Sequence, residues 1–152
     1  MNKQADKITE NTIELAFSSN PKFMKLLRQS IEFACLDMGI TDFKPIIFAI
    51  DEACTNIIRH AYKMDFSQKI AVLIQWIPKE KIDFFLCDFA EKVDLNQIKP
   101  RDLNEIRPGQ MGVSIYHEVM DEVEWIQSSE VGNTLHFVKY FQSPKQKKDN
   151  AS

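Results

Sequence analysis

Glu52 and Asn56 lie four residues apart in the segment from Ile46 to Tyr62, where the chain shows its clearest chemical pattern. If this segment is a helix, the two side chains are neighbours on one face and can contact the same ligand. An amide oxygen can bind the hard cation Mg2+, and a carboxylate can orient or deprotonate an attacking hydroxyl group. The pair is therefore a candidate magnesium–phosphate site, while a solvated polar helix face is the alternative that the same spacing allows.

His60 continues the row of Glu52 and Asn56 by another turn, but it drifts toward the edge of the opposite, apolar side. It can contact the same ligand, and a packed or capping histidine is the alternative. The apolar side consists of Ile46, Ile50, Ala53, Cys54, Ile57 and Ala61, which recur at helical spacing. This spacing predicts a helix over residues 41–63 that buries the apolar side and exposes the polar row.

The segments around this helix show both strand and helix patterns. Strands are expected over residues 8–17, 69–77, 81–89, 122–128 and 134–141. Ser19-Asn20-Pro21 predicts the start of a helix that stops at Gly39, and a further helix is expected over residues 111–120. This order predicts an α+β fold, a two-layer α/β sandwich whose mixed, mostly antiparallel sheet is covered by helices on one face.

Residues 91–110 are polar, include two prolines and one glycine, and show no clear period. A stretch of this length without regular structure is uncommon within a compact domain and often forms a lid over a site. We expect one domain over residues 8–142, a flexible N-terminus at residues 1–7, and a disordered tail at residues 143–152.

The 152-residue chain has the composition of an ordinary globular protein, with 44% hydrophobic and 27% charged residues. A net charge of -3 and the lack of a basic cluster before the tail argue against direct nucleic-acid binding. No apolar run approaches the roughly 20 residues of a membrane span, and the polar start is unlike a secretory signal. The three cysteines lack metal-ligand spacing and are expected to be buried free thiols in the cytoplasm.

Four parts of the chain resemble the motifs of GHKL ATPases, in the order that the family has. The N box is similar to Asp51-Glu52-Ala53-Cys54-Thr55-Asn56 and His60-Ala61-Tyr62, in the form found in bacterial anti-sigma-factor kinases of the stress-response and sporulation type. The first glycine box is similar to the strand end at Asp88, and the second to Arg107-Pro108-Gly109-Gln110-Met111-Gly112-Val113. The closing motif is similar to Gly132-Asn133-Thr134, so the resemblance covers roughly residues 17–141.

The resemblance implies a Bergerat-type ATP-binding fold with Glu52 as general base and Asn56 as the magnesium ligand. Asp88 would accept a hydrogen bond from the adenine amino group, supported by Thr134, because that donor is costly to bury unpaired. The glycines would let backbone amides approach phosphate oxygens, at the positive end of the following helix. The nucleotide-binding positions carried over from the family are Asn56, His60, Asp88, Ala90, Arg107, Gly109, Gly112 and Thr134.

In the family, such a module holds a sigma factor away from RNA polymerase and phosphorylates a serine of an anti-sigma antagonist. The resemblance therefore implies an anti-sigma factor and serine protein kinase that uses ATP and Mg2+, with a sigma factor and a STAS-type antagonist as partners. A homodimer is also expected, and the lack of a long apolar run predicts that no membrane is among the partners. Arg28 falls near a family arginine that contacts both partners, and a solvated surface arginine is the alternative.

Ala90 and Gln110 depart from the family pattern, since many members have glycine at these positions. The departures bear on nucleotide affinity more than on the fold. They leave a second function open, that of a nucleotide-dependent partner-binding protein without significant kinase activity.

Overall fold

The computed structural model describes residues 10–91, 111–126 and 132–142, with the backbone alone at 111–114. Its elements are β1 (Thr12–Ser18), a 3-10 turn (Pro21–Phe23), α1 (Met24–Met38), α2 (Lys44–Asn56), a π-helical turn (Ile57–Ala61), β2 (Lys69–Ile77), β3 (Lys81–Asp88), α3 (Met111–Val119), β4 (Glu122–Ile126) and β5 (Asn133–Tyr140). The expected N-terminal segment, the tail and almost all of the expected lid lie outside the described residues.

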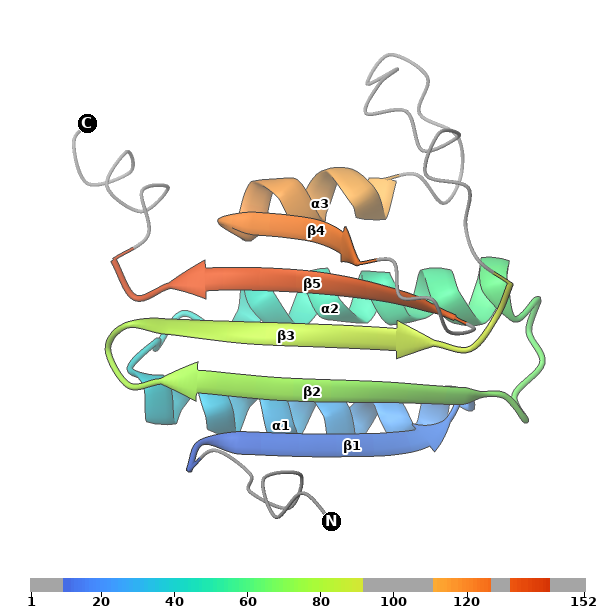
Figure 1. The fold of residues 1–152 in the computed structure, drawn as a ribbon, viewed down its shortest axis with the longest axis horizontal. Coiled ribbons are helices and arrows are strands. Elements are labelled where there is room, and N and C mark those ends of the chain that lie inside the picture. The colour runs from blue at the N-terminus through green and yellow to red at the C-terminus, as the bar shows by residue number, and fades with distance from the viewer. Residues whose placement is uncertain (1–9, 92–110, 127–131, 143–152) are drawn as a thin grey trace, which may run out of the picture.

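The strands form one sheet in the order β1-β2-β3-β5-β4, and every described pairing is antiparallel. In Figure 1 the strands cross the front of the molecule, while α1 and α2 lie behind them. α3 packs on α2 and β4 and so extends the helical layer. The two-layer α+β architecture is confirmed. The sheet, expected as mixed and mostly antiparallel, is antiparallel throughout its described part.

Alternation along the central strands sends one set of side chains into the helical layer. The buried members of this set in β2 and β3 are Ile70, Val72, Ile74, Trp76, Ile82, Phe84 and Leu86. The register places Ile74 opposite Phe84, so neighbouring strands contribute to the same apolar surface. The last position of this row on β3 is Asp88, which places a carboxylate at the end of an otherwise apolar strand face.

The helix that carries Glu52 and Asn56 buries most of its predicted apolar side, but its last turn differs from the prediction. Ile58 is buried, although the regular helical period places it off the apolar side, and Ala61 is exposed. The cause is the π-helical turn, which is wider than an α-helical turn and therefore shifts the direction of every later side chain.

The helix ends follow local signals only in part. Asn20 Oδ1 accepts a hydrogen bond from the Lys22 amide over 3.0 Å, and Gly39 ends α1 in a left-handed conformation with φ of 110°, both as the sequence indicates. The second helix begins at Lys44 rather than at residue 41, and Phe43 at its N-terminus provides no side-chain cap.

All three cysteines are free thiols in the structure; Cys35 and Cys54 are buried and Cys87 is half-buried. Burial raises the pKa of Cys35 to about 12, so this thiol stays protonated at neutral pH. Among the described residues, no helix is long and apolar enough to cross a membrane.

Candidate nucleotide and metal site

The polar face of α2 presents Glu52 and Asn56 side by side, both half-buried. The Asn56 amide nitrogen donates a hydrogen bond to the hydroxyl of Tyr116 on α3, with 2.6 Å between Nδ2 and the phenol oxygen. Within the described residues, no group of three or more His, Cys, Asp or Glu side chains could hold a metal. Mg2+ often uses one or two protein ligands together with phosphate oxygens and water, so a single amide oxygen fits this cation when a nucleotide is bound.

The π-helical turn that follows Asn56 carries Arg59 and His60, both exposed. Such turns are rare in proteins, and those that occur are frequently found at functional sites. In the described part of the protein, His60 makes no hydrogen bond or ion pair. No hydrogen bond or ion pair among the described residues therefore joins His60 to the Glu52–Asn56 pair, and its nucleotide-binding role stays a prediction.

Asp88 is 5% exposed and holds one carboxylate oxygen in a fixed environment. Its Oδ1 accepts hydrogen bonds from the Ala90 amide and from Asn133 Nδ2, each over 3.0 Å. Its Oδ2 makes no hydrogen bond with any described residue. An oriented carboxylate with one unbonded oxygen fits the acceptor that an adenine amino group requires.

Two of the three residues after Asp88, Phe89 and Glu91, are held by side chains from distant parts of the chain. The Phe89 amide donates to the Tyr62 hydroxyl over 2.7 Å, and that hydroxyl donates to the Lys69 carbonyl oxygen. Asn133 Nδ2 also contacts the Glu91 carbonyl oxygen at 3.0 Å. Burial, and to a lesser extent the charge of Asp88, raises the pKa of Tyr62, which keeps its hydroxyl available as a donor.

Thr134 makes no hydrogen bond to Asp88, and its role in nucleotide binding stays a prediction. The register pairs Thr134 with Cys87, and its hydroxyl donates to Cys87 Sγ over 3.4 Å, on the sheet face opposite the helices. Asn133 pairs with Asp88 and supplies the supporting hydrogen bond instead. Because side chains alternate along a strand, a shift of one residue exchanges the two faces.

Sequence reasoning missed Asn133, Tyr62 and Tyr116 as site residues. Tyr62 and Asn133 both lie within the quoted family motifs, so a test of each polar side chain in those motifs could have found them. Tyr116 had no such signal, because it reads as one more apolar position of its helix.

Gly132 precedes Asn133, and the backbone conformation at position 132 requires glycine. Its φ is 111°, and a Cβ atom here would lie 2.2 Å from the Asp88 carbonyl oxygen. A left-handed backbone costs an ordinary residue about 1–2 kcal/mol, and a backbone oxygen cannot move aside as a flexible side chain can. Glycine therefore allows β5 to approach the end of β3 closely.

Gly132→Ala is expected to destabilise the protein by about 2 kcal/mol or more in urea unfolding. Gly39→Ala is the matched control, since its φ is 110° but its nearest contact is a side-chain atom of Phe141 at 3.0 Å. The control should lose less stability than Gly132→Ala. Equal losses would show that the contact with the Asp88 carbonyl oxygen is unimportant.

The phosphate-binding residues are described only in part. Arg107 and Gly109 lie outside the described residues. Gly112 is the second residue of α3, so it lies in the first turn of the helix that carries Tyr116. Ala90 is half-buried beside Asp88, and its amide is already bonded to that carboxylate.

Arg28 lies on α1, and its Nε donates to Asp51 Oδ2 on α2 over 2.7 Å. The two side chains are 49% and 21% exposed, so the ion pair lies at the surface between the helices. Asp51 immediately precedes Glu52, but successive residues of a helix point about 100° apart, so the ion pair lies on a different face of α2 from the Glu52–Asn56 row.

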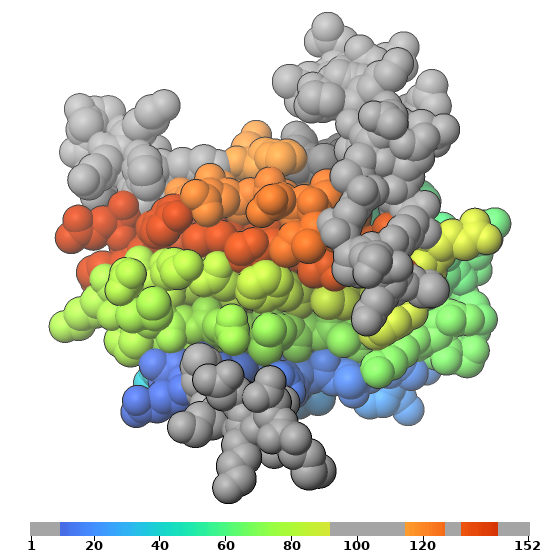
Figure 2. Space-filling model, viewed as in Figure 1, coloured from blue at the N-terminus to red at the C-terminus, as the bar shows by residue number. Residues whose placement is uncertain are grey.

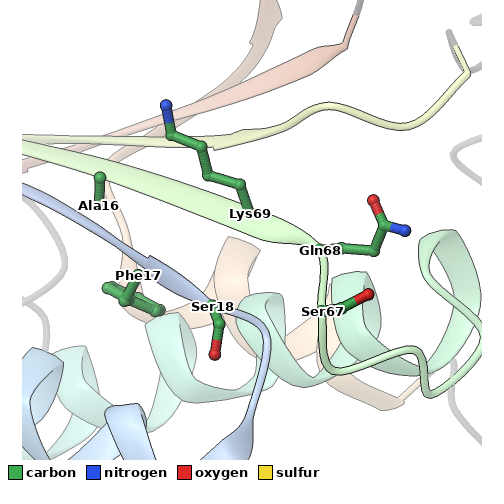
Figure 3. A pocket seen from close by; sticks show the side chains of 6 residues that line it. All are labelled: Ala16, Phe17, Ser18, Ser67, Gln68 and Lys69. Carbon is green, nitrogen blue, oxygen red and sulfur yellow. The ribbon is translucent and has the colours of Figure 1, made fainter.

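A shallow cavity of about 320 Å³ opens elsewhere, at the edge formed by β1 and β2. Figure 3 shows the side chains that line it, which are Ala16, Phe17, Ser18, Ser67, Gln68 and Lys69. None of the predicted nucleotide-binding residues is among them, so we do not assign this cavity to the nucleotide.

Known proteins show similarity over the same region. A Bacillus subtilis (strain 168) protein named serine-protein kinase RsbW is 26% identical over 139 residues, which cover 84% of this chain and 84% of the relative. Its namesake from Staphylococcus aureus (strain MSSA476) is 28% identical over 141 residues, with 86% and 87% covered.

A crystal structure of the RsbU and RsbW domains of a Mycobacterium tuberculosis protein matches with a TM-score of 0.56 and 14% identity. The match covers 84% of this chain and 31% of that chain, and it supports the fold alone. The family described as the histidine kinase-like ATPase domain matches residues 17–139, which include the whole of α2, β2 and β3 and nearly all of β5. The chain therefore belongs to the histidine kinase-like ATPase domain family.

Proposed function

We propose that the chain is an anti-sigma factor that also acts as an ATP-dependent serine protein kinase on an anti-sigma antagonist. The observation that carries the nucleotide part is Asp88, whose Oδ1 is held by two donors while Oδ2 makes no bond with a described residue. The names of the relatives support the kinase part. Incubation with labelled ATP and a STAS-type antagonist tests the proposal, and label on a serine of the antagonist is the expected result.

Each of the predicted site residues is proposed to have a defined role in this reaction. Asp88 accepts a hydrogen bond from the adenine amino group, and Asn133 holds Asp88 in place. Asn56 holds Mg2+, which when bound neutralises charge on the phosphate oxygens. Glu52 accepts the proton of the serine hydroxyl as that oxygen bonds to the γ-phosphorus atom and ADP leaves. Arg107, Gly109 and Gly112 are proposed to enclose the triphosphate, as the family motifs imply.

We place the partner surface on the outer side of α1 and α2, around Arg28. This side also exposes Phe48, at 52% of its area, in addition to the Arg28–Asp51 ion pair. Arginine and aromatic residues, phenylalanine included, are enriched at protein interfaces. Asp51 and Glu52 are consecutive residues of α2, and we propose that the bound partner extends around this helix to the face that carries Glu52.

Arg28→Glu is expected to weaken binding of the sigma factor and the antagonist on the order of 10-fold or more, because it reverses a charge in the interface. ATP affinity should be unchanged. Lys79→Glu makes the same charge reversal in the turn between β2 and β3 and is the control. Wild-type partner affinity in Arg28→Glu, measured by calorimetry, would remove Arg28 from the interface.

The homodimer implied by the family resemblance is also a proposal. Support comes from the sheet face that no described helix covers, seen from the front in Figure 2. Leu73 and Phe85 pair on this face and are only half-buried, which suits a surface that is covered on association. Light scattering at micromolar concentrations measures the mass of the assembly.

Ala90 favours the second candidate function. In this alternative, the protein binds its partner in a nucleotide-dependent way but has no significant kinase activity. It adds a Cβ next to Asp88, at a half-buried position where many family members have glycine. The labelled-ATP experiment separates the two functions, because a binding protein would retain nucleotide-dependent affinity for its partner without transferring the label.

A further inference from the structure

The orientation of the Asn56 side chain decides whether it can bind a cation. Only the amide oxygen can act as a ligand for Mg2+, since the NH2 group is purely a donor. Rotation about the last side-chain bond exchanges Oδ1 and Nδ2, and this torsion is soft. When Oδ1 turns to the cation, the NH2 group needs an acceptor of its own, so the affinity for Mg2+ depends on the partner of the nitrogen end.

The hydroxyl of Tyr116 is such a partner. It accepts the hydrogen bond from Asn56 Nδ2 over 2.6 Å, across 60 residues of sequence. This hydrogen bond occupies the nitrogen end of the amide and leaves the oxygen end for another ligand.

The phenol ring is itself held in a fixed position. Tyr116 is 4% exposed and packs edge-on against Phe137 of β5, with ring centroids 5.5 Å apart. The packed ring therefore keeps the hydroxyl at a defined position beside Asn56.

We propose that Tyr116 is a positioning residue whose hydroxyl holds Asn56 with Oδ1 turned toward the magnesium ion. The inference rests on the proposed Mg-ATP function, and it adds that magnesium affinity depends on a residue outside α2. Because Tyr116 lies on α3, in the helix whose first turn contains Gly112, magnesium affinity depends on the docking of α3 against α2.

Tyr116→Phe removes the hydroxyl and keeps the buried ring. ATP affinity is measured by calorimetry at increasing Mg2+ concentrations. The Mg2+ requirement is the concentration that gives half of the maximal gain in ATP affinity, and it should rise roughly 3- to 10-fold. ATP affinity in EDTA should be unchanged, because Asp88 and its partners are untouched. Tyr140→Phe is the control; it removes a hydroxyl that is bonded to Glu122 and should change neither quantity. An unchanged Mg2+ requirement in Tyr116→Phe would overturn the inference.

The Asn56→Asp variant tests whether Tyr116 acts by orienting the side chain at position 56 or only by packing. A carboxylate offers an oxygen in either orientation, so it needs no partner to select one end. Tyr116→Phe should therefore raise the Mg2+ requirement less in the Asn56→Asp background than in the wild type, because the hydroxyl can still donate to the carboxylate but does not decide which atom faces the cation. A shift of the same size in both backgrounds would mean that Tyr116 acts through packing alone, and the inference would fail.

Nuclear magnetic resonance provides a test without nucleotide. In the free protein, the side-chain NH2 signals of Asn56 should shift and exchange faster with water in Tyr116→Phe, since their hydrogen bond is lost. Unchanged NH2 signals would overturn the inference even if ATP binds. Failure of the proposed function would look different, because the wild-type protein would then bind no ATP with or without Mg2+.

Discussion

Glu52→Gln is expected to lower phosphoryl transfer to the antagonist by about 10²- to 10⁴-fold while ATP affinity stays close to that of the wild type. Glutamine has nearly the shape of glutamate but cannot accept the proton of the serine hydroxyl. Glu52 is half-buried and makes no hydrogen bond or ion pair with a described residue, so the substitution breaks no described contact. The loss should therefore fall on the chemical step.

Single-turnover transfer from labelled ATP measures that step, and calorimetry measures ATP and partner affinity on the same preparations. Glu80→Gln is the control, because Glu80 is an exposed glutamate in the turn between β2 and β3. It should transfer label at the wild-type rate. If Glu52→Gln also transfers label at that rate, Glu52 is not the base.

Asp88→Asn is expected to weaken ATP binding on the order of 10²-fold, with or without Mg2+. The substitution removes the charge of the acceptor, and it can place an NH2 group opposite the adenine amino group. In the other orientation, the NH2 group faces the fixed side, where Asn133 Nδ2 and the Ala90 amide both donate to Asp88 Oδ1. The new NH2 group, the Ala90 amide and Asn133 Nδ2 would then be three donors facing one another without an acceptor.

Asp83→Asn is the matched control for this variant. Asp83 is another buried carboxylate of β3, at 8% exposure, but its Oδ1 lies 2.7 Å from His136 Nε2 on the opposite face of the sheet. Its loss can lower stability and should leave ATP affinity unchanged in the folded protein. Near-wild-type ATP affinity in Asp88→Asn would remove Asp88 from adenine recognition.

The sequence was sufficient for features that depend on neighbouring residues. Alternation and helical spacing predicted the strands and helices with small errors at their ends, and the α+β architecture followed from their order. The spacing of Glu52 and Asn56 predicted that they share a face of α2, which is confirmed by the structure. These features have periods of two or 3.6 residues, so a short window contains all the necessary information.

One local prediction was wrong because the local period changed. The π-helical turn after Asn56 exposes Ala61 and buries Ile58. Hydrogen bonds such as that from the Tyr62 amide to the Ile57 carbonyl oxygen, over 2.9 Å, define this wider turn. A window read at the α-helical period has no means of detecting it.

The sequence by itself determined which residues form the strands, the helices and the polar row of α2. Only the tertiary structure decided that Asn133 rather than Thr134 supports Asp88, and that Tyr116 bonds to Asn56. The physical reason is distance along the chain. Strand register and helix docking join residues 45 and 60 positions apart, and they are set by the packing of the whole core rather than by any local period.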